Sequence, residues 1–139
     1  MATVQKFEDL EIWQLARILA KDIFILTQTV KLAKDFALKD QMNRSSGSIM
    51  DNIAEGYGRG SRLEFIQFLS FSTGSADELK SQLYRCLDKE YITKEKFDDL
   101  YEKANAIYKK TNGFIKYLNS TVVKGTKFKE RLGTKSNGK

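Results

Sequence analysis

The stretch TKEKFDDLYEKANAIYKKTNGFIKYL, residues 93–118, decides the fold of this chain. Its seam residues recur at alternating intervals of three and four, the period of a helix that buries one face. They are Phe97, Leu100, Ala104, Ile107, Thr111, Phe114 and Leu118. Thr93 is a suitable N-cap, and Glu95 lies in the first turn, where the helix dipole favours an acid. The pattern predicts a long helix that packs along the seam of a helical bundle.

Three earlier segments, residues 9–30, 36–57 and 61–89, carry apolar stripes with the same helical period. The chain contains no proline, so nothing interrupts long helices strongly. The links between the segments are short, including a charged link at residues 31–35, and short links join antiparallel neighbours. The sequence therefore predicts an all-α protein, an antiparallel up-down-up-down four-helix bundle over residues 1–119.

Capping signals mark the starts of the second and third helices. Asp35 is a suitable N-cap for the second, and Ser61 with Glu64 matches the capping box for the third. The link between them, GYGRG at residues 56–60, suits a helix stop because glycine adopts positive φ readily. It leads into a helix N-terminus, a place that favours anions. It lacks the Gly-Lys-Ser/Thr ending of a P-loop and follows no strand, which favours a turn over a nucleotide site.

The second helix carries a stripe of small and polar residues. Two interpretations are open, a ligand groove or a close approach to the third helix, and the close approach is favoured. The same approach would compensate the cost of a mid-helix glycine at Gly74, beside Ser75. Asn52 and Glu55 are then candidate buried partners in that contact. The stripe residues are Ser45, Ser48, Asn52 and Gly56.

The start of the third helix is apolar around its whole circumference. Six of the nine residues from 63 to 71 are leucine, isoleucine or phenylalanine, and at about 100° per residue they point in all directions. A single bundle buries one face of each helix, so part of this set would stay in water. Neighbouring helix ends and the glycine link are one possible cover. The favoured interpretation is homo-oligomerisation through Leu63, Phe65, Phe68 and Phe71.

The absence of histidine limits the chemistry of the chain. It removes Ser-His and Cys-His catalysis and the usual zinc and di-iron ligand sets. The one cysteine, Cys86, lies on an apolar stripe and is expected in the core. We therefore expect no enzyme activity, no metal and no cofactor. The N-terminus lacks a signal-peptide pattern and no apolar run is long enough to span a membrane, so a cytoplasmic location is expected.

The net charge of +6 is concentrated at the C-terminus. Residues 124–139 hold six basic side chains and one acidic one, which leaves 18 basic and 17 acidic side chains in the other 123 residues. We expect residues 120–139 to be a disordered basic tail, either a merely solubilising end or a source of phosphate contacts. The candidate nucleic-acid contacts are Arg44, Arg59, Arg62, Lys124, Lys127, Lys129 and Arg131. A solvated turn is the alternative interpretation of Arg59 and Arg62.

Five motifs occur in order along the chain: FEDLEIWQ at 7–14, QMNRSSGSI at 41–49, NIAEG at 52–56, EFIQFL at 64–69 and GSADEL at 74–79. Their order resembles the 23S rRNA intervening-sequence protein family. The resemblance covers about residues 7–118, and NIAEG with the GSxxEL pattern makes it fairly specific. Most members carry alanine after the arginine of the second helix, where this chain has Ser45 and Ser46. That departure implies a difference in packing.

The resemblance implies a four-helix bundle that assembles into a homopentameric barrel. Genes of this family lie in intervening sequences of bacterial 23S rRNA genes. The family is related to the accessory protein of diversity-generating retroelements, which binds nucleic acid and a reverse transcriptase. It supplies no catalytic residues to transfer. The leading hypothesis is a non-enzymatic oligomer associated with nucleic acid, RNA before DNA. The alternative is a scaffold that recruits a protein partner without touching nucleic acid.

Overall fold

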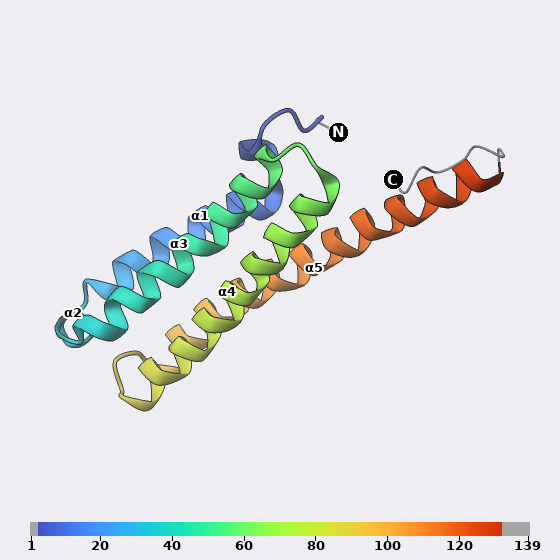
Figure 1. Cartoon of the computed structure of the whole chain (residues 1–139). Helices are drawn as coiled ribbons and strands as arrows, with labels where there is room; N and C mark the ends of the chain where they lie inside the picture. Colours follow the sequence, from blue (N-terminus) through green and yellow to red (C-terminus); the bar gives the residue numbers. More distant parts are fainter. Residues whose placement is uncertain (1–2, 132–139) are drawn as a thin grey trace.

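The computed structural model describes residues 3–131, with side chains up to residue 121, and this part of the chain is all-α. Four long helices, α1, α3, α4 and α5, run antiparallel to one another in chain order, as predicted (Figure 1). The elements are the 3-10 helix η1 Phe7–Asp9 and the helices α1 Glu11–Thr27, α2 Val30–Lys34, α3 Phe36–Gly58, α4 Arg62–Asp88 and α5 Lys94–Arg131.

The long helices surround one apolar core. Helix α3 packs against α1 and α4, and α5 packs against α4 and α1, so α1 and α4 occupy diagonal corners. The interface between α1 and α5 is the least extensive of the four. The core comes from the predicted stripes of all four helices, and its fully buried members include Leu19, Ile23, Met42, Ile49, Ile53, Leu69, Leu79, Leu83 and Leu100.

The three predicted N-caps are confirmed. The side-chain oxygens of Asp35, Ser61 and Thr93 each accept a hydrogen bond from the backbone N–H three residues later, at 3.3, 3.3 and 3.1 Å. Each bond satisfies an N–H group that has no partner inside its helix. The Glu64 carboxylate faces the Arg59 guanidinium at 3.8 Å instead of completing the predicted capping box.

The prediction of a non-helical link at residues 31–35 is wrong, because most of this segment is helical. Helix α1 ends at Thr27, where the hydroxyls of Thr27 and Thr29 donate to main-chain carbonyls three residues earlier, both at 2.7 Å. The chain then forms the separate short helix α2. Leu32 within it is completely buried against the core. Burial of the Leu32 side chain therefore favours a helix in a segment whose charges suggested a link.

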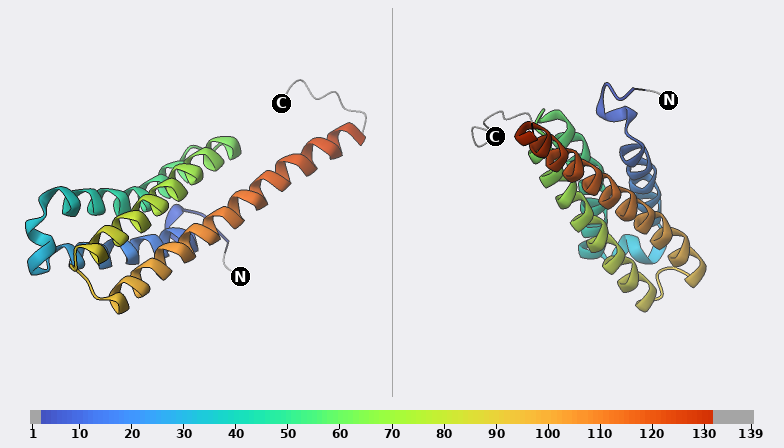
Figure 2. Two further views of the ribbon diagram at one scale, coloured as in Figure 1. Left: turned by 90° about the horizontal axis from the view of Figure 1, so that it is seen from below. Right: turned by 90° about the vertical axis from the view of Figure 1, so that its right-hand side faces the viewer.

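Helix α5 is longer than the periodic stretch that predicted it. It continues to Arg131, while residues 132–139 lie outside the described part, and the disordered tail over 120–139 stays a prediction. The domain boundary at 119 stays a prediction. At about 1.5 Å per residue, α5 is about 57 Å long against about 40 Å for α4. Its C-terminal part projects beyond the other helices (Figure 2).

Serine hydroxyls join α3 to α4, which confirms the close approach predicted from the polar stripe. The buried Ser45 hydroxyl donates to Gln82 Oε1 at 2.6 Å. Ser75 donates to the Ser48 hydroxyl at 2.9 Å, and Ser72 donates to a main-chain carbonyl of α3 at 2.8 Å. Because these groups are bonded across the contact, the stripe serves helix packing.

Gly56 lies at a tight contact between α3 and α4. A Cβ atom at Gly56 would lie 2.6 Å from the Cβ of Phe68, a distance that real side chains do not reach. Gly74 behaves differently, because a Cβ there would meet nothing within 4 Å. The expectation that close packing compensates Gly74 within the chain is therefore wrong.

Asn52 and Glu55 are not the buried partners that the sequence suggested. The Asn52 amide donates to Ser48 on its own helix, at 2.9 Å to both the hydroxyl and the main-chain carbonyl. Glu55 is exposed and pairs with Arg59 at 3.1 Å. The spacing places Asn52 and Glu55 on the same side of α3. Their partners, Ser48 and Arg59, lie about one helical turn away along the chain and not on α4.

Lys80 joins α4 to α5. Its ammonium donates to Asn105 Oδ1 at 3.1 Å and pairs with Asp77 at 3.1 Å, while the side chain is only 12% exposed. The same nitrogen lies 4.2 Å from the ring centroid of Tyr108 and 5.6 Å from that of Tyr101. Aromatic faces attract a cation, so the two tyrosine rings, the Asp77 carboxylate and the Asn105 amide oxygen all stabilise the Lys80 ammonium in this position.

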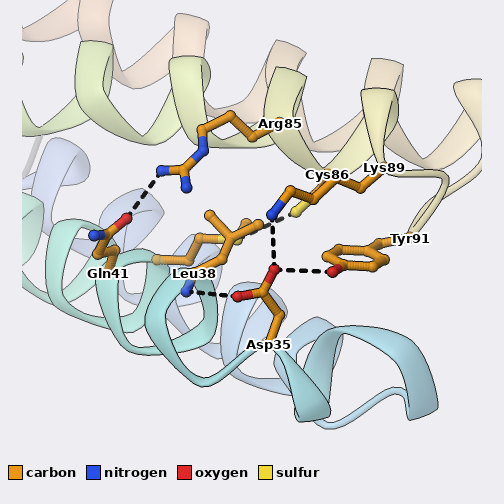
Figure 3. Close-up of polar contacts among 8 residues, drawn as sticks. Asp35, Leu38, Gln41, Arg85, Cys86, Lys89 and Tyr91 are labelled. Atoms are coloured by element: carbon orange, nitrogen blue, oxygen red, sulfur yellow. Dashed lines mark hydrogen bonds and ion pairs between the residues drawn. The ribbon is translucent and has the colours of Figure 1, made fainter.

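Asp35 ties the start of α3 to the turn between α4 and α5 (Figure 3). Its carboxylate accepts hydrogen bonds from Lys89 Nζ at 3.0 Å, Tyr91 Oη at 2.8 Å and the Leu38 N–H at 3.3 Å. These bonds favour the charged form and lower the pKa of Asp35 from 3.8 to about 2. The cap thus holds two distant segments together at one end of the bundle.

Asp35→Asn is expected to reduce stability at pH 7, with a difference from the wild type that narrows as the pH falls. The folded-state pKa lies below the unfolded value, so the carboxylate stabilises the protein above about pH 4 and loses that effect towards pH 2. Urea unfolding of both proteins between pH 7 and pH 2 measures this. The exposed Asp51→Asn is the control. A difference that stays constant over this range would contradict the assignment.

Candidate nucleic-acid interface

Arg59 and Arg62 lie together at the link between α3 and α4, where Gly60 adopts a φ of 72°. The Arg59 guanidinium is already engaged. It lies 3.1 Å from the Glu55 carboxylate, 3.8 Å from that of Glu64, and 5.0 Å from the ring centroid of Phe68. Because two carboxylates offset its charge, Arg59 attracts a phosphate group less strongly than its position in the sequence suggests.

Arg62 is the first residue of α4 and is exposed. Among the residues with described side chains, no carboxylate comes within ion-pair distance of it. It lines an open hollow of about 170 Å³ together with Tyr57, Gly60, Ser61, Phe65 and Leu118. Leu118 belongs to α5, so Arg62 lies beside the helix that continues into the basic C-terminal segment.

The four predicted basic contacts of that segment, Lys124, Lys127, Lys129 and Arg131, lie on the α5 backbone. Their side chains lie outside the described residues. The helix places their backbone at the same end of the molecule as Arg59 and Arg62 (Figure 1).

Arg44 does not join this group. It lies in the middle of α3, about 22 Å from Arg59 along the helix axis at about 1.5 Å per residue. Its guanidinium pairs with Asp40 at 3.3 Å. It lines a separate polar groove of about 310 Å³ between α3 and α4, with Gln41, Ser45, Ser48 and Glu78. The structure therefore divides the predicted arginines between two places.

The four predicted interface residues at the start of α4 differ in exposure. Phe65 is buried and packs edge-on against Tyr57 and Phe114, so it is the least accessible of the four to a second copy, and its role in an interface stays a prediction. Phe68 is half-buried. Leu63 and Phe71 are 67% and 49% exposed. Helical periodicity could not separate these cases, because residues covering the whole circumference do not indicate which side faces the core.

A basic and aromatic surface on α1 is a feature that the sequence reading missed. Arg17 lies 5.8 Å from the ring centroid of the half-buried Trp13, and Lys21 follows one turn later. These residues line a shallow hollow of about 350 Å³ with Gln14 and Ile18. The signal was available, since two basic residues and no acid occur between residues 12 and 21. It was hidden because Trp13 also fits the apolar stripe.

The described residues offer little reactive chemistry. They contain no group of three or more side chains able to hold a metal ion. The Cys86 thiol is completely buried, as predicted, 3.3 Å from the Met42 sulfur. Burial raises the pKa of Cys86 to about 11, which disfavours the nucleophilic thiolate. Within residues 3–131, no helix has the length and hydropathy needed to cross a membrane.

Comparison with known proteins agrees with this helical architecture. A crystal structure of a protein of unknown function from the S23 ribosomal protein family of Bacteroides thetaiotaomicron superposes with a TM-score of 0.71. The two chains share 28% identity over 76% of this chain and 95% of the other. No curated protein matches the chain. The model of the 23S rRNA-intervening sequence proteins matches residues 8–113, which agrees with the resemblance of the motifs. The chain belongs to the family of 23S rRNA-intervening sequence proteins.

Proposed function

We propose that this chain is a non-enzymatic, self-assembling cytoplasmic protein that binds RNA at the end where the α3–α4 link meets α5. The supporting observation is the position of Arg62, exposed at the N-terminus of α4 and lining one hollow with Leu118 of α5. From there α5 continues to Arg131 through Lys124, Lys127 and Lys129, with Glu130 as the single acidic residue in 122–131. A guanidinium at a helix N-terminus beside a basic helix suits phosphate.

The distribution of charge favours binding without sequence readout. Outside residues 124–139 the chain is almost neutral, and two of its arginines already face carboxylates, Arg44 that of Asp40 and Arg59 those of Glu55 and Glu64. Phosphate contacts then come from one end of the molecule and carry no base information. The family is named for intervening sequences of 23S rRNA, which favours RNA over DNA.

Removal of residues 122–139 together with Arg62→Ala is expected to weaken binding to a structured RNA at least tenfold at low salt. Each lost phosphate contact lowers the magnitude of the slope of log affinity against log salt by roughly 0.7–0.9, so loss of the five candidate contacts Arg62, Lys124, Lys127, Lys129 and Arg131 lowers it by about four. Affinities measured at several salt concentrations test this. Lys31→Ala with Lys34→Ala, two exposed lysines on α2, is the control. An unchanged slope in the truncated protein would show that the basic end does not bind RNA.

Self-assembly is the second element of the proposal, and the pentameric barrel of the family is its specific form. Several large apolar side chains are half or more exposed on α1 and α4, among them Ile18, Phe24, Ile25 and Leu63. Such exposure marks interaction surfaces in soluble proteins. Sedimentation of the wild type distinguishes a pentamer from a monomer directly.

The same surfaces favour a second candidate function, a scaffold that recruits a protein partner. On this view the apolar faces of α1 and α4 bind another protein and the basic end has no specific role. A partner that copurifies with the full-length chain after nuclease treatment, while RNA affinity is unaffected by the truncation, would favour the scaffold.

A further inference from the structure

The outward side of α1 forms a basic and apolar surface, here called the α1 face: Gln14, Arg17, Ile18, Lys21 and Ile25. Ile18 and Ile25 are 54% and 56% exposed, and Arg17 and Lys21 are exposed beside them. Gln14, Ile18, Lys21 and Ile25 follow one another at intervals of four, three and four, and Arg17 lies one turn from both Gln14 and Lys21, so the five share one side of the helix.

The acidic residues of α1 do not neutralise this face. Glu11 pairs with Lys110 at 3.6 Å, and Asp22 accepts a hydrogen bond from Lys103 at 3.0 Å. That bond raises the pKa of Lys103. Both partners are on α5, so the carboxylates of α1 point into the seam between α1 and α5. The two positive charges of the α1 face therefore remain directed outward.

The outward side of α4 forms the opposite kind of surface, here called the α4 face: Leu63, Gln67, Phe71, Gly74 and Glu78. Leu63 and Phe71 are 67% and 49% exposed, and the other three are exposed as well. Among described side chains, no lysine or arginine lies within ion-pair distance of Glu78. Arg44 and Glu78 line the same groove between α3 and α4, but the Arg44 guanidinium pairs with Asp40.

The two faces match in size and carry opposite charge. The α1 face spans about 17 Å and the α4 face about 22 Å, at about 1.5 Å per residue. Two α1 faces would bring basic residues together, and two α4 faces would leave Glu78 against Glu78 or uncharged residues. A contact between unlike faces removes apolar side chains from water and pairs opposite charges.

A cavity beside the α1 face offers a place for an anchoring side chain. It has a volume of about 130 Å³ and lies in the loosely packed seam between α1 and α5. Ile18 belongs both to the cavity and to the α1 face. Phe71, near the middle of the α4 face, is the half-exposed aromatic side chain that this cavity suits. The cavity is lined by Leu15, Ile18, Leu19, Lys103, Ala106 and Ile107.

We propose that the α1 face of one copy docks on the α4 face of a second copy, with Phe71 at the cavity between α1 and α5. This inference rests on the self-assembly in the proposed function and adds the two surfaces that meet. Since α1 and α4 lie at diagonal corners of the bundle, every copy keeps one free face of each kind. Such a head-to-tail contact can repeat from copy to copy, and it forms a closed ring where the rotation between neighbouring copies divides a full turn.

Charge exchange between the two faces tests the proposal. Arg17→Glu with Lys21→Glu reverses the α1 face, and Gln67→Lys with Glu78→Lys reverses the α4 face without touching the ion pair of Asp77 and Lys80. Each pair of changes is expected to weaken self-association tenfold or more in sedimentation experiments, which corresponds to about 1.4 kcal/mol. All four changes in one chain make the faces complementary again and are expected to restore assembly.

A mixture of the two double variants gives an independent result. Each reversed face meets its unlike complement only on the other variant, so hetero-assembly is expected on mixing, and a mixture that does not assemble would contradict the pairing. A contact between two α1 faces or two α4 faces would be weakened in at most one of the double variants, whereas pairing of unlike faces weakens both. Lys31→Glu with Lys34→Glu, outside both faces, is the charge control and is expected to assemble like the wild type. Circular dichroism checks that every variant stays helical.

Phe71→Ala tests the anchor, with Phe36→Ala as the matched control, because Phe36 is 73% exposed and lies on neither face. Only Phe71→Ala is expected to weaken assembly. If the wild type assembles but the charge-reversed variants assemble equally well, the pairing of these faces is wrong while self-assembly stands. A monomeric wild type overturns both, and RNA affinity measured on the same sample judges the nucleic-acid proposal separately.

Discussion

Replacing Gly56 with leucine is expected to lower the free energy of unfolding by about 3 kcal/mol, since overpacking a tight contact costs about 1–3 kcal/mol and leucine adds a whole side chain. A Cβ at this position would lie 2.6 Å from Phe68 Cβ and 3.1 Å from the Phe65 ring. Both partners belong to α4, so the two helices would have to separate. Urea unfolding at fixed protein concentration measures the change.

Gly47→Ala is the matched control on the same helix. A Cβ at Gly47 would meet nothing within 4 Å, so the better helix propensity of alanine should raise stability by about 1 kcal/mol. Gly56→Ala has the same gain in propensity but adds the Cβ that meets Phe68, and it is expected to lower stability. If Gly56→Ala stabilised the protein as much as Gly47→Ala, the close approach of α3 and α4 would be refuted.

Leu32→Ala is expected to cost about 3 kcal/mol, a typical loss when a buried leucine becomes alanine and leaves a cavity. Leu32 is 0% exposed although α2 has only 5 residues. It is the only buried side chain of that helix, so α2 has little else to hold it on the core. Thermal and urea unfolding measure the loss.

Val30→Ala on the same short helix is the control, because Val30 is 74% exposed and its truncation should change stability by less than about 0.5 kcal/mol. Equal effects at the two positions would contradict the anchoring role of Leu32. Hydrogen exchange adds a local reading, with faster exchange of the α2 amides expected in Leu32→Ala alone.

The candidate site was only partly predictable from the sequence. Charge counting directed attention to Arg59 and Arg62, and the structure places both at one end of the bundle. It could not show that Arg59 pairs with Glu55 and Glu64, because Glu64 lies on the next helix and reaches Arg59 only after the link folds. The α1 face was missed for a different reason: Arg17 and Lys21 occur without an acid between residues 12 and 21, but Trp13 beside them also fits the apolar stripe.

Local patterns in the sequence determined the four long helices and the N-caps of three of them, α3, α4 and α5. A helical period and a capping hydroxyl or carboxylate act within one or two turns, so Asp35, Ser61 and Thr93 could be identified without knowing the fold. Tertiary structure decided what depends on a distant neighbour. The segment that looks like a link forms the helix α2, in which Leu32 is buried against the core. Phe65 is buried, whereas Leu63, two residues earlier, stays exposed to water. At the start of α4 the apolar residues cover the whole circumference, so the helical period does not indicate which side is buried. The positions of α3 and α5 decide which side that is.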